Sequence, residues 1–573
     1  MNKIFKVIWS KSKQCYIVVS EIAKNKTGKK KIVVASILAA LAMAGSMQSV
    51  DATIPEGAAT GTATFAIGQQ SDANGAFGFA IGNNAKFNSG TLGFAIGVNS
   101  EATSNQSIAI GYLSKAAGRN IGGGGDPALA VGAGANATAG GATAIGMVAN
   151  ASNTFATAIG KSAAASGDSS IAIGQNTKAT QEKAIAIGDA SQATIIGATA
   201  LGRSSEATGS SATALGSLAS ATGTLATAVG MQASASGNES LAIGTTASAT
   251  SGRALAVGTN AKATGASSVA VGSGAGGSGP RGFASSINSS GAVVNTNKTI
   301  NYATIAEGDN AVALGYYANA KNSGVAVGQN ALAATGGVAI GKGVFEDTNN
   351  IHAGGVAIGL DSASTGVYSL AMGRHAFASG STSMAMGYEA SANGNFAVAM
   401  GRKVSATGSS TAIGHHATAS NGGLAIGSQE NDASDDRTTA SAKGAVAIGK
   451  NAKATSEDAV AIGTNAEATR LKSVALGSGS TTATGATNQG STTINGITYN
   501  FTGATGNPNM QVSVGSAGAT RQIKNVAAGE VSATSTDAIN GSQLYAVASA
   551  VKPLKYVSVN STATGTGSNV DND

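Results

Sequence analysis

The sequence predicts an all-β fold, a parallel β-solenoid in which one short unit is stacked on copies of itself. The main observation is a glycine, preceded by two apolar residues, that returns every 14 residues without a break. The glycines of this regular array are Gly132, Gly146, Gly160, Gly174, Gly188, Gly202, Gly216, Gly230, Gly244, Gly258 and Gly272. Such a unit is too short for a pair of helices, but it can hold two short strands and two tight turns, where glycine supplies backbone angles that side chains disfavour.

The two strands of a unit differ in pattern. The first, as in Ile171-Ala172-Ile173, has aliphatic residues on both sides of an alanine, so burial of both faces is expected. The second, as in residues 162–166 or 232–236, mostly alternates alanine with polar residues, the pattern of a strand with one face in water. We expect the aliphatic residues of the first strand and the alanines of the second to fill the single interior of the coil. The other face of the first strand must then contact another chain, which predicts an oligomer.

Composition favours a repeat protein over an ordinary globular core. The 573 residues include 82 glycines and 5 prolines, and aromatic residues make up only 4%. The formal net charge is +7, but the lysine-rich residues 1–45 account for it, so the rest of the chain is close to neutral. That remainder lacks the basic excess with which proteins bind nucleic acid or an anionic membrane.

Residues 1–52 are predicted to be a targeting segment. Their lysines are followed by an apolar run at residues 32–45, which is too short to span a membrane as a helix. Small residues place candidate cleavage sites at Ala44 and Ala52. The only cysteine, Cys15, lies in this segment, so the rest of the chain can form no internal disulfide. The chain is expected to be exported through the inner membrane.

Two resemblances follow from these patterns. Residues 1–10 and 15–21 resemble the extended signal peptide of type V secretion proteins of Gram-negative bacteria. The repeated Ala-Ile-Gly and Ala-Val-Gly units resemble the YadA-like head of trimeric autotransporter adhesins. The second resemblance implies a trimeric left-handed parallel β-roll, with three identical chains packed side by side. It also implies a place on the bacterial cell surface, with an outer-membrane anchor C-terminal to these residues.

The head repeats are expected at residues 60–272 and 309–477. Residues 273–308, rich in glycine, serine, asparagine and threonine, are expected to form a head insert, and residues 429–443 a solvated, charged loop. Within a further insert at residues 478–514, the dipeptide Asn495-Gly496 predicts a hairpin turn.

Residues 515–552 are similar to the short neck of the same family, which narrows the wide head onto a thinner trimeric stalk. The residues that carry this similarity include Arg521, Gln522, Ile523, Asn525, Val526, Asp537, Ala538, Asn540, Gln543 and Leu544. Ser535 or Thr536 is expected to cap a short helix that Pro553 ends. Residues 553–573 are expected to start a further, truncated segment.

The sequence offers little chemistry for catalysis, and neither a cofactor nor a metal is expected. The four histidines occupy turns or inserts without an acidic or cysteine partner at metal-ligand spacing; they are His352, His375, His415 and His416. A left-handed β-helix acyltransferase would have a much shorter period and a histidine between chains, whereas no histidine lies between Gly132 and Gly272. The threonine ranks of ice-binding solenoids do not recur in register, and aspartates of calcium-binding nonapeptide repeats are scarce within the coils.

The predicted function is therefore that of a non-enzymatic surface adhesin, which attaches to host extracellular-matrix or cell-surface proteins through many copies of a weak site. The family resemblance implies collagen as one partner, bound by strands of the Asn-Ser-Val-Ala-Ile-Gly type. The related candidate ligand-binding stretch is Ser268, Val269, Ala270, Val271, Gly272 and Ser273, whose residues also fit the core of a coil. The alternative is a structural spacer or a self-association module for autoaggregation or biofilm.

Overall fold

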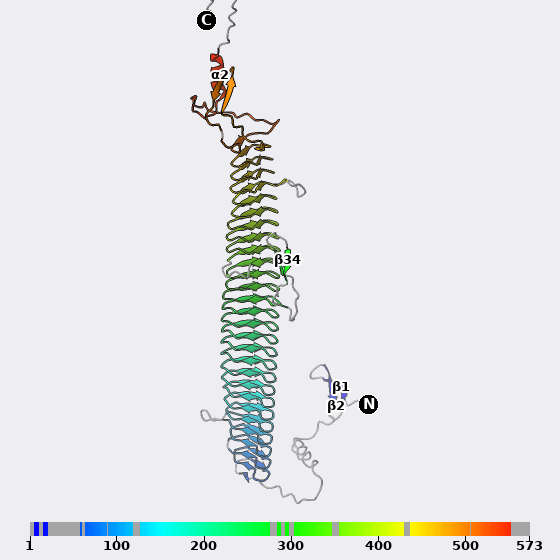
Figure 1. Cartoon of the computed structure of the whole chain (residues 1–573). Helices are drawn as coiled ribbons and strands as arrows, with labels where there is room; N and C mark the ends of the chain where they lie inside the picture. Colours follow the sequence, from blue (N-terminus) through cyan, green and yellow to red (C-terminus); the bar gives the residue numbers. More distant parts are fainter. Residues whose placement is uncertain are drawn as a thin grey trace, which may run out of the picture.

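The structure of the chain is a computed structural model. It describes residues 5–10, 15–20, 58–59, 64–88, 90–118, 126–274, 284–287, 293–296, 303–346, 354–428, 436–504 and 506–551. Figure 1 shows a long, straight rod of stacked coils, topped at its C-terminal end by a small irregular segment. Each coil contributes one strand to each of two parallel ladders, which confirms the predicted β-solenoid.

The first ladder is built from three-residue strands, of which the described residues contain 27. At about 4.8 Å per coil, this number corresponds to a rod about 130 Å long. The strands are β4 (Phe65–Ile67), β6 (Phe79–Ile81), β8 (Phe94–Ile96), β10 (Ile108–Ile110), β12 (Leu129–Val131), β14 (Thr143–Ile145), β16 (Thr157–Ile159), β18 (Ile171–Ile173), β20 (Ile185–Ile187), β22 (Thr199–Leu201), β24 (Thr213–Leu215), β26 (Thr227–Val229), β28 (Leu241–Ile243), β30 (Leu255–Val257), β32 (Val269–Val271), β36 (Val312–Leu314), β38 (Val325–Val327), β40 (Val338–Ile340), β42 (Val356–Ile358), β44 (Leu370–Met372), β46 (Met384–Met386), β48 (Val398–Met400), β50 (Thr411–Ile413), β52 (Leu424–Ile426), β54 (Val446–Ile448), β56 (Val460–Ile462) and β58 (Val474–Leu476).

The second ladder is built from two-residue strands; all but β3, which precedes β4, follow a first-ladder strand in the sequence. They are β3 (Ala58–Ala59), β5 (Asp72–Ala73), β7 (Lys86–Phe87), β9 (Glu101–Ala102), β11 (Lys115–Ala116), β13 (Asn136–Ala137), β15 (Asn150–Ala151), β17 (Ala164–Ala165), β19 (Lys178–Ala179), β21 (Gln192–Ala193), β23 (Glu206–Ala207), β25 (Ser220–Ala221), β27 (Ser234–Ala235), β29 (Ser248–Ala249), β31 (Lys262–Ala263), β35 (Ile305–Ala306), β37 (Asn319–Ala320), β39 (Leu332–Ala333), β41 (Phe345–Glu346), β43 (Ala363–Ser364), β45 (Phe377–Ala378), β47 (Ser391–Ala392), β49 (Ser405–Ala406), β51 (Thr418–Ala419), β53 (Thr439–Ala440), β55 (Lys453–Ala454) and β57 (Glu467–Ala468).

Equivalent residues of neighbouring coils lie side by side in both ladders. In the first ladder, Ala172 pairs with Ala158 on one side and Ala186 on the other. The stack continues across the longest insertion, because β31 pairs with β35 and β32 pairs with β36. Insertions therefore leave the column of coils at a turn and do not interrupt its hydrogen-bond ladders.

Alanine fills the interior of the coil. The middle residue of every first-ladder strand after β4 and the second residue of most second-ladder strands are alanines without exposed surface, such as Ala172 and Ala179. The neighbours of Ala172, Ile171 and Ile173, are only half-buried in the single chain. The expectation that the aliphatic residues of the first strand fill the interior is therefore wrong: they form the outer face of the first ladder. The interior is too narrow for them, since apart from Phe87 its largest fully buried side chains are valine and threonine.

Serine takes the place of alanine at several interior positions because its hydroxyl finds a partner within its own turn. The hydroxyl of Ser170 donates to the carbonyl oxygen of Gly167 at 2.7 Å, and that of Ser240 donates to Gly237 at 2.6 Å. A buried hydroxyl without such a bond would be costly. Small polar residues can therefore enter the core without unpaired groups.

Six strands of the described residues form antiparallel pairs outside the two ladders, and two of these pairs lie in the N-terminal targeting segment and in the insertion after β32. β1 (Phe5–Ser10) pairs with β2 (Cys15–Ser20), and β33 (Ala284–Ile287) pairs with β34 (Val293–Thr296). Neither pair extends the ladders of the solenoid. The strands of the N-terminal targeting segment, here called the leader, thus take no part in the ladders of the solenoid.

The C-terminal segment begins where the coils end. A hairpin of β59 (Ser491–Ile494) and β60 (Ile497–Asn500) turns at Asn495 and Gly496, and β61 (Val512–Ser513) then pairs with β58 and extends the first ladder. A helix, α2 (Gly541–Ala550), follows (Figure 1). Within the residues that the structure describes, no helix is long and apolar enough to cross a membrane.

The helix α2 begins later than the sequence suggested. Its N-cap is Asn540, whereas the hydroxyl oxygen of Ser535 accepts a hydrogen bond from the backbone N–H of Asp537 at 3.1 Å. Serine at this position therefore supports a local turn and not the start of a helix. The helix ends at Ala550, with Val551 as its C-cap, and Pro553 lies outside the described residues.

Candidate functional site

The glycine that follows each first-ladder strand, here called the coil glycine, has a structural task. The eleven coil glycines of the regular array have φ angles between +123° at Gly258 and +152° at Gly272, a region that disfavours side chains. A Cβ atom on Gly174 would also lie 2.5 Å from the carbonyl oxygen of Gly188 in the next coil. The coil glycines thus allow neighbouring coils to approach closely, and they offer no group for chemistry.

The outer face of the first ladder is an aliphatic stripe that follows the whole rod. The first and third residues of its strands are leucine, isoleucine, valine, methionine, phenylalanine or threonine, and most are half-buried. In the single chain, Leu201 keeps 40% and Leu476 45% of its surface exposed. Continuous apolar surface of this extent is typical of a protein interface.

The outer face of the second ladder is mostly polar. Nζ of Lys115 lies 3.1 Å from a carboxylate oxygen of Glu101 in the preceding coil. The side-chain amide of Asn136 donates to the side-chain oxygen of Asn150 at 3.1 Å. These pairs run along the rod between equivalent positions, and they are typical of a solvated face.

The candidate ligand-binding stretch from Ser268 to Ser273 is largely part of a coil. Ser268 is fully buried, its hydroxyl donates to the carbonyl oxygen of Gly265 at 2.7 Å, and Ala270 has no exposed surface. Val269 and Val271 lie on the aliphatic face of the first ladder, and Ser273 is exposed in the turn after the coil glycine Gly272. Only the last of these positions offers a polar group to a ligand.

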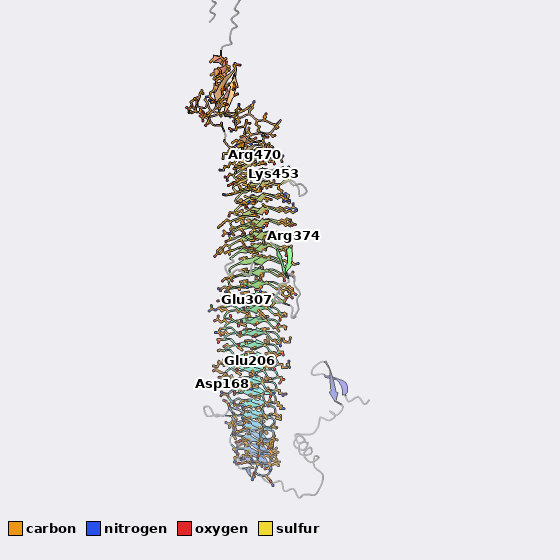
Figure 2. All side chains as sticks on the ribbon, viewed as in Figure 1. Asp168, Glu206, Glu307, Arg374, Lys453 and Arg470 are labelled. Carbon is orange, nitrogen blue, oxygen red and sulfur yellow. The ribbon has the colours of Figure 1, made fainter. Side chains whose placement is uncertain are left out.

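The turn that joins a first-ladder strand to the second-ladder strand of the same coil, here called the first turn, carries charged and aromatic side chains in four successive coils. They directly follow the coil glycines at positions 373, 387, 401 and 414. We call this set the basic turn patch; it consists of Arg374, His375, Tyr388, Glu389, Arg402, Lys403, His415 and His416. Figure 2 shows Arg374 on the flank of the solenoid, pointing away from its axis.

Side chains of neighbouring coils contact one another in this patch. The guanidinium carbons of Arg374 and Arg402 each lie 5.6 Å from the centre of the Tyr388 ring, at cation–π distance. The ring of His375 meets Tyr388 edge-on at 6.4 Å between centroids. Nη1 of Arg402 lies 2.9 Å from Nε2 of His415 and donates to it, since arginine can only donate.

The one acidic residue of the patch is engaged within it. A hydrogen bond to the Glu389 carboxylate raises the pKa of Tyr388, and partial burial and the negative charge of Glu389 act in the same direction. Sequence reasoning assigned His375, His415 and His416 to solvated turns and missed the partners that neighbouring coils supply. The signal that could have found them is position, because every patch residue follows a coil glycine by one or two residues.

The predicted neck residues gather around the start of α2. The side-chain amide of Asn540 donates to the carbonyl oxygen of Val526 at 3.1 Å, and the side chain of Gln543 bonds both the N–H and the carbonyl of Gly529. A carboxylate oxygen of Asp537 accepts from the N–H of Glu530 at 3.1 Å. These contacts tie residues 526–530 to the helix.

The remaining neck residues reach back to the solenoid or outward. Nη1 of Arg521 donates to the hydroxyl of Ser480 at 2.9 Å and to the carbonyl oxygen of Val514 at 2.6 Å, across the last coil. The other predicted neck residues are exposed in the single chain; they are Gln522, Ile523, Asn525, Ala538 and Leu544. Within the described residues, the apolar side chains of Ile523 and Leu544 stay largely exposed, at 71% and 65%.

The described part of the chain holds no group of three or more histidine, cysteine, aspartate or glutamate side chains that could bind a metal ion. His352 and the candidate cleavage residues Ala44 and Ala52 lie outside the described residues.

Three family models match the chain. The model described as "Extended Signal Peptide of Type V secretion system" matches residues 1–49, and "Coiled stalk of trimeric autotransporter adhesin" matches residues 522–573. The model described as "YadA head domain repeat (2 copies)" matches the solenoid repeatedly, at residues 59–85, 89–114, 124–149, 165–191, 179–205, 193–219, 221–247, 249–275, 302–318, 306–331, 378–403, 440–466 and 454–480.

Relatives of the chain are similar over limited parts. The autotransporter adhesin BtaE of Brucella suis biovar 1 (strain 1330) is 57% identical over 63 residues, which are 11% of this chain and 8% of that protein. The collagen-binding domain of the Yersinia adhesin YadA is 25% identical over 39% of this chain and 83% of that chain, with a TM-score of 0.19. The C-terminal YadA-like domain of a Burkholderia pseudomallei protein is 51% identical over 17% of this chain and 44% of that chain, with a TM-score of 0.16.

The matches agree with one another along the sequence. A leader for type V secretion precedes head repeats that coincide with the stacked coils, and a stalk match follows them. The leader marks a protein that is secreted to the cell surface, and the head repeats mark an adhesin. This chain belongs to the family of trimeric autotransporter adhesins.

Proposed function

We propose that the solenoid is the head of a homotrimeric adhesin that attaches bacteria to host extracellular-matrix or cell-surface components. The observation that carries the proposal is the aliphatic stripe on the outer face of the first ladder. It extends from β4 to β58 and is only half-buried by its own chain. Two further copies of the chain would remove this surface from water along the whole rod.

The C-terminal segment supports the same assembly. Leu544 in α2 keeps 65% of its surface exposed in the single chain, and Val547 of the same helix and its C-cap residue Val551 are also exposed. These residues are spaced by three and four positions, so they share one helix face. Helices of three chains packed through this face would form the start of a stalk.

We infer that the head attaches through its repeated surface. The rod presents equivalent turns and polar strand faces at every coil, so a trimer displays many copies of similar surface. Weak contacts that bind together give retention through avidity, without a deep pocket. This arrangement suits long, repetitive partners such as matrix fibres.

Collagen is one proposed partner, but the stretch from Ser268 to Ser273 offers it little free surface. In the proposed trimer, Val269 and Val271 would face another chain, and Ser268 and Ala270 are interior. We therefore expect collagen or other matrix proteins to contact turns and second-ladder faces. The proposed location is the bacterial surface, with an outer-membrane anchor C-terminal to these residues and leader cleavage at Ala44 or Ala52.

The proposal is tested in two measurements on residues 53–552, with a trimeric coiled coil fused after the last residue. Light scattering should give the mass of three chains, and a monomer would contradict the trimer. Immobilised collagen and other matrix proteins should bind the protein, while beads coated with it should stay dispersed. Aggregation of the beads without matrix binding would instead favour the self-association module.

A further inference from the structure

We propose that the basic turn patch is a binding site for sulfated polysaccharide chains. The patch comprises the first turns of four successive coils, from Arg374 to His416. This inference concerns a glycan ligand and one defined site, and so it goes beyond attachment to matrix proteins by repeated surface. It also lies outside the stretch from Ser268 to Ser273.

The geometry of the patch suits a linear ligand that runs along the rod. Its four rungs lie on equivalent positions of successive coils, at a spacing of about 4.8 Å. Arg374 and Arg402 are two coils apart, and the Tyr388 ring lies between them at 5.6 Å from each guanidinium carbon. The cationic side chains thus form a row parallel to the solenoid axis, on the flank where Figure 2 places Arg374.

The patch is positively charged because basic side chains lie close together on successive coils. Among the patch residues, Arg374, Arg402 and Lys403 carry positive charge and Glu389 carries the one negative charge. At physiological salt the Debye length is about 8 Å, so charges one or two coils apart act together on a polyanion. In the sequence, Asp361 lies in the coil before the patch, and four acidic residues follow its last rung: Glu430, Asp432, Asp435 and Asp436.

Basic residues occupy the same turn position elsewhere without neighbours of their kind. Lys161, Arg203 and Lys342 each follow a coil glycine directly and are exposed. The residues at the same position in the adjacent coils are Met147, Gln175, Asp189, Ser217, Gln329 and Leu360. These three turns therefore provide matched single charges against which the cluster can be compared.

The arginines of the patch are held in place before a ligand arrives. Stacking on Tyr388 restrains both guanidinium groups, and the bond from Arg402 to His415 restrains one of them further. An arginine has five N–H donors, and its planar fork can bind two oxygens of one sulfate group. Restrained side chains lose less conformational freedom on binding, which favours a bound sulfate.

Tyr388 also argues against nucleic acid as the ligand. Proteins that bind single strands stack bases on open aromatic faces. The rungs on either side of Tyr388 place Arg374 and Arg402 over its ring, and His375 meets its edge. A sulfated polysaccharide needs only regularly spaced cations, and these the patch supplies.

The test uses residues 53–573, because the lysine-rich leader would itself bind a polyanion and its strands pair only with each other. The probe is heparin, with desulfated heparin as the ligand control. The patch variant carries Arg374→Ser, Arg402→Ser and Lys403→Ser. The matched control carries Lys161→Ser, Arg203→Ser and Lys342→Ser, so that both variants lose three positive charges from exposed first turns.

We expect heparin to bind the unaltered chain and the control with similar affinity, and the patch variant about tenfold more weakly at ~0.15 M salt. The salt dependence should be less steep for the patch variant, because fewer counterions are released. Equal losses in both variants would show that net charge alone decides binding and would overturn the proposal. So would equal binding of desulfated heparin, stronger binding of single-stranded DNA than of heparin, or no binding of heparin.

A second measurement covers the case in which the patch variant fails to fold. Heparin should protect Lys403 of the unaltered chain from acetylation more than Lys161 or Lys342. Uniform protection of all three lysines, or protection of none, would overturn the proposal. Matrix-protein binding can be measured on the same samples, so a failure of the adhesin proposal is distinguishable from a failure of this one.

Discussion

Phe87 and Gly93 fit together in the interior of the solenoid, since a Cβ atom on Gly93 would overlap the Phe87 ring. Phe87 is fully buried and occupies a second-ladder position that holds alanine in most other coils. Cβ atoms on Gly75 and Gly78 would overlap the same ring. One aromatic side chain thus enters an alanine core because three glycines of adjacent coils leave room for it.

This relationship predicts strong coupling between the two residues. Gly93→Ala should destabilise the coils around residues 72–102, because the added methyl group and the ring cannot occupy the same space. Phe87→Ala alone should cost about 3 kcal/mol or more through the cavity that it leaves. In the double variant the methyl group enters the vacated space, so its loss of stability should be well below the sum of the two single losses. Hydrogen exchange of these coils measures all three effects, and additive losses would contradict the packing described.

A coil glycine should tolerate substitution far less well than a glycine elsewhere in a turn. Gly174→Ala should cost at least about 2 kcal/mol, because φ is +133° and the Cβ would approach the carbonyl oxygen of Gly188. Gly252→Ala is the matched control, since the nearest atom to its Cβ would be the carbonyl oxygen of Asn238 at 3.8 Å. Its effect should stay within about 0.5 kcal/mol. Thermal unfolding compares the melting temperatures of the two variants. Similar values would contradict the structural role of the coil glycine.

The solenoid could be predicted from the sequence because the repeat period and the positions of the coil glycines can both be read within a single chain. A 14-residue spacing and a positive φ after each first-ladder strand leave few other folds. It did not predict which side of that strand faces inward, because Ile171, Ala172 and Ile173 are all apolar and give no contrast in polarity. Residue size settles the question, since the narrow interior accepts Ala172 and excludes isoleucine.

The basic turn patch was missed for a different reason. Arg374, Tyr388 and Arg402 are separated by 14 residues in the sequence and become neighbours only when equivalent turns are stacked. Each of them alone is an ordinary surface residue. Long-range contacts of this kind are visible from sequence only after the register of the coils is written out.

The size limit of the interior gives a further prediction. Ala172→Leu should destabilise the chain by about 1–3 kcal/mol, because Ala172 has no exposed surface and lies between two close ladders. Ile171→Leu, one residue away on the outer face, keeps the volume and should cost less than about 1.5 kcal/mol. Chemical unfolding measures the difference. Equal costs at the two positions would mean that the interior can expand, and the explanation for the reversed strand would fail.

Charges introduced on the two outer faces should have opposite consequences for assembly. Glutamate in place of Ile159, Ile173 and Ile187 should open the trimer locally, because unpaired charges would be buried against another chain. Glutamate in place of Lys178, Gln192 and Ser220, on the second ladder of nearby coils, should leave the assembly intact. Light scattering reports the mass, and hydrogen exchange reports local opening where the rest of the rod holds the trimer together. Equal protection from hydrogen exchange in both variants would mean that the chains of the trimer contact one another through another surface.

Asn540 has two tasks in the neck, and two substitutions separate them. Its side-chain oxygen accepts from the N–H of Gln543 at 3.1 Å, and its side-chain amide donates to the carbonyl oxygen of Val526 at 3.1 Å. Asn540→Asp keeps the capping oxygen and loses the amide donor, whereas Asn540→Ala loses both.

We expect the alanine variant to lose about 1 kcal/mol of helix stability through the missing cap. The aspartate variant should keep the helix but should release residues 526–530, because a carboxylate cannot donate to Val526. Hydrogen exchange of α2 and of these residues distinguishes the two outcomes. Loss of both segments in the aspartate variant would mean that the cap depends on the contact with Val526, so that the helix and residues 526–530 form a single cooperative unit at the base of the head.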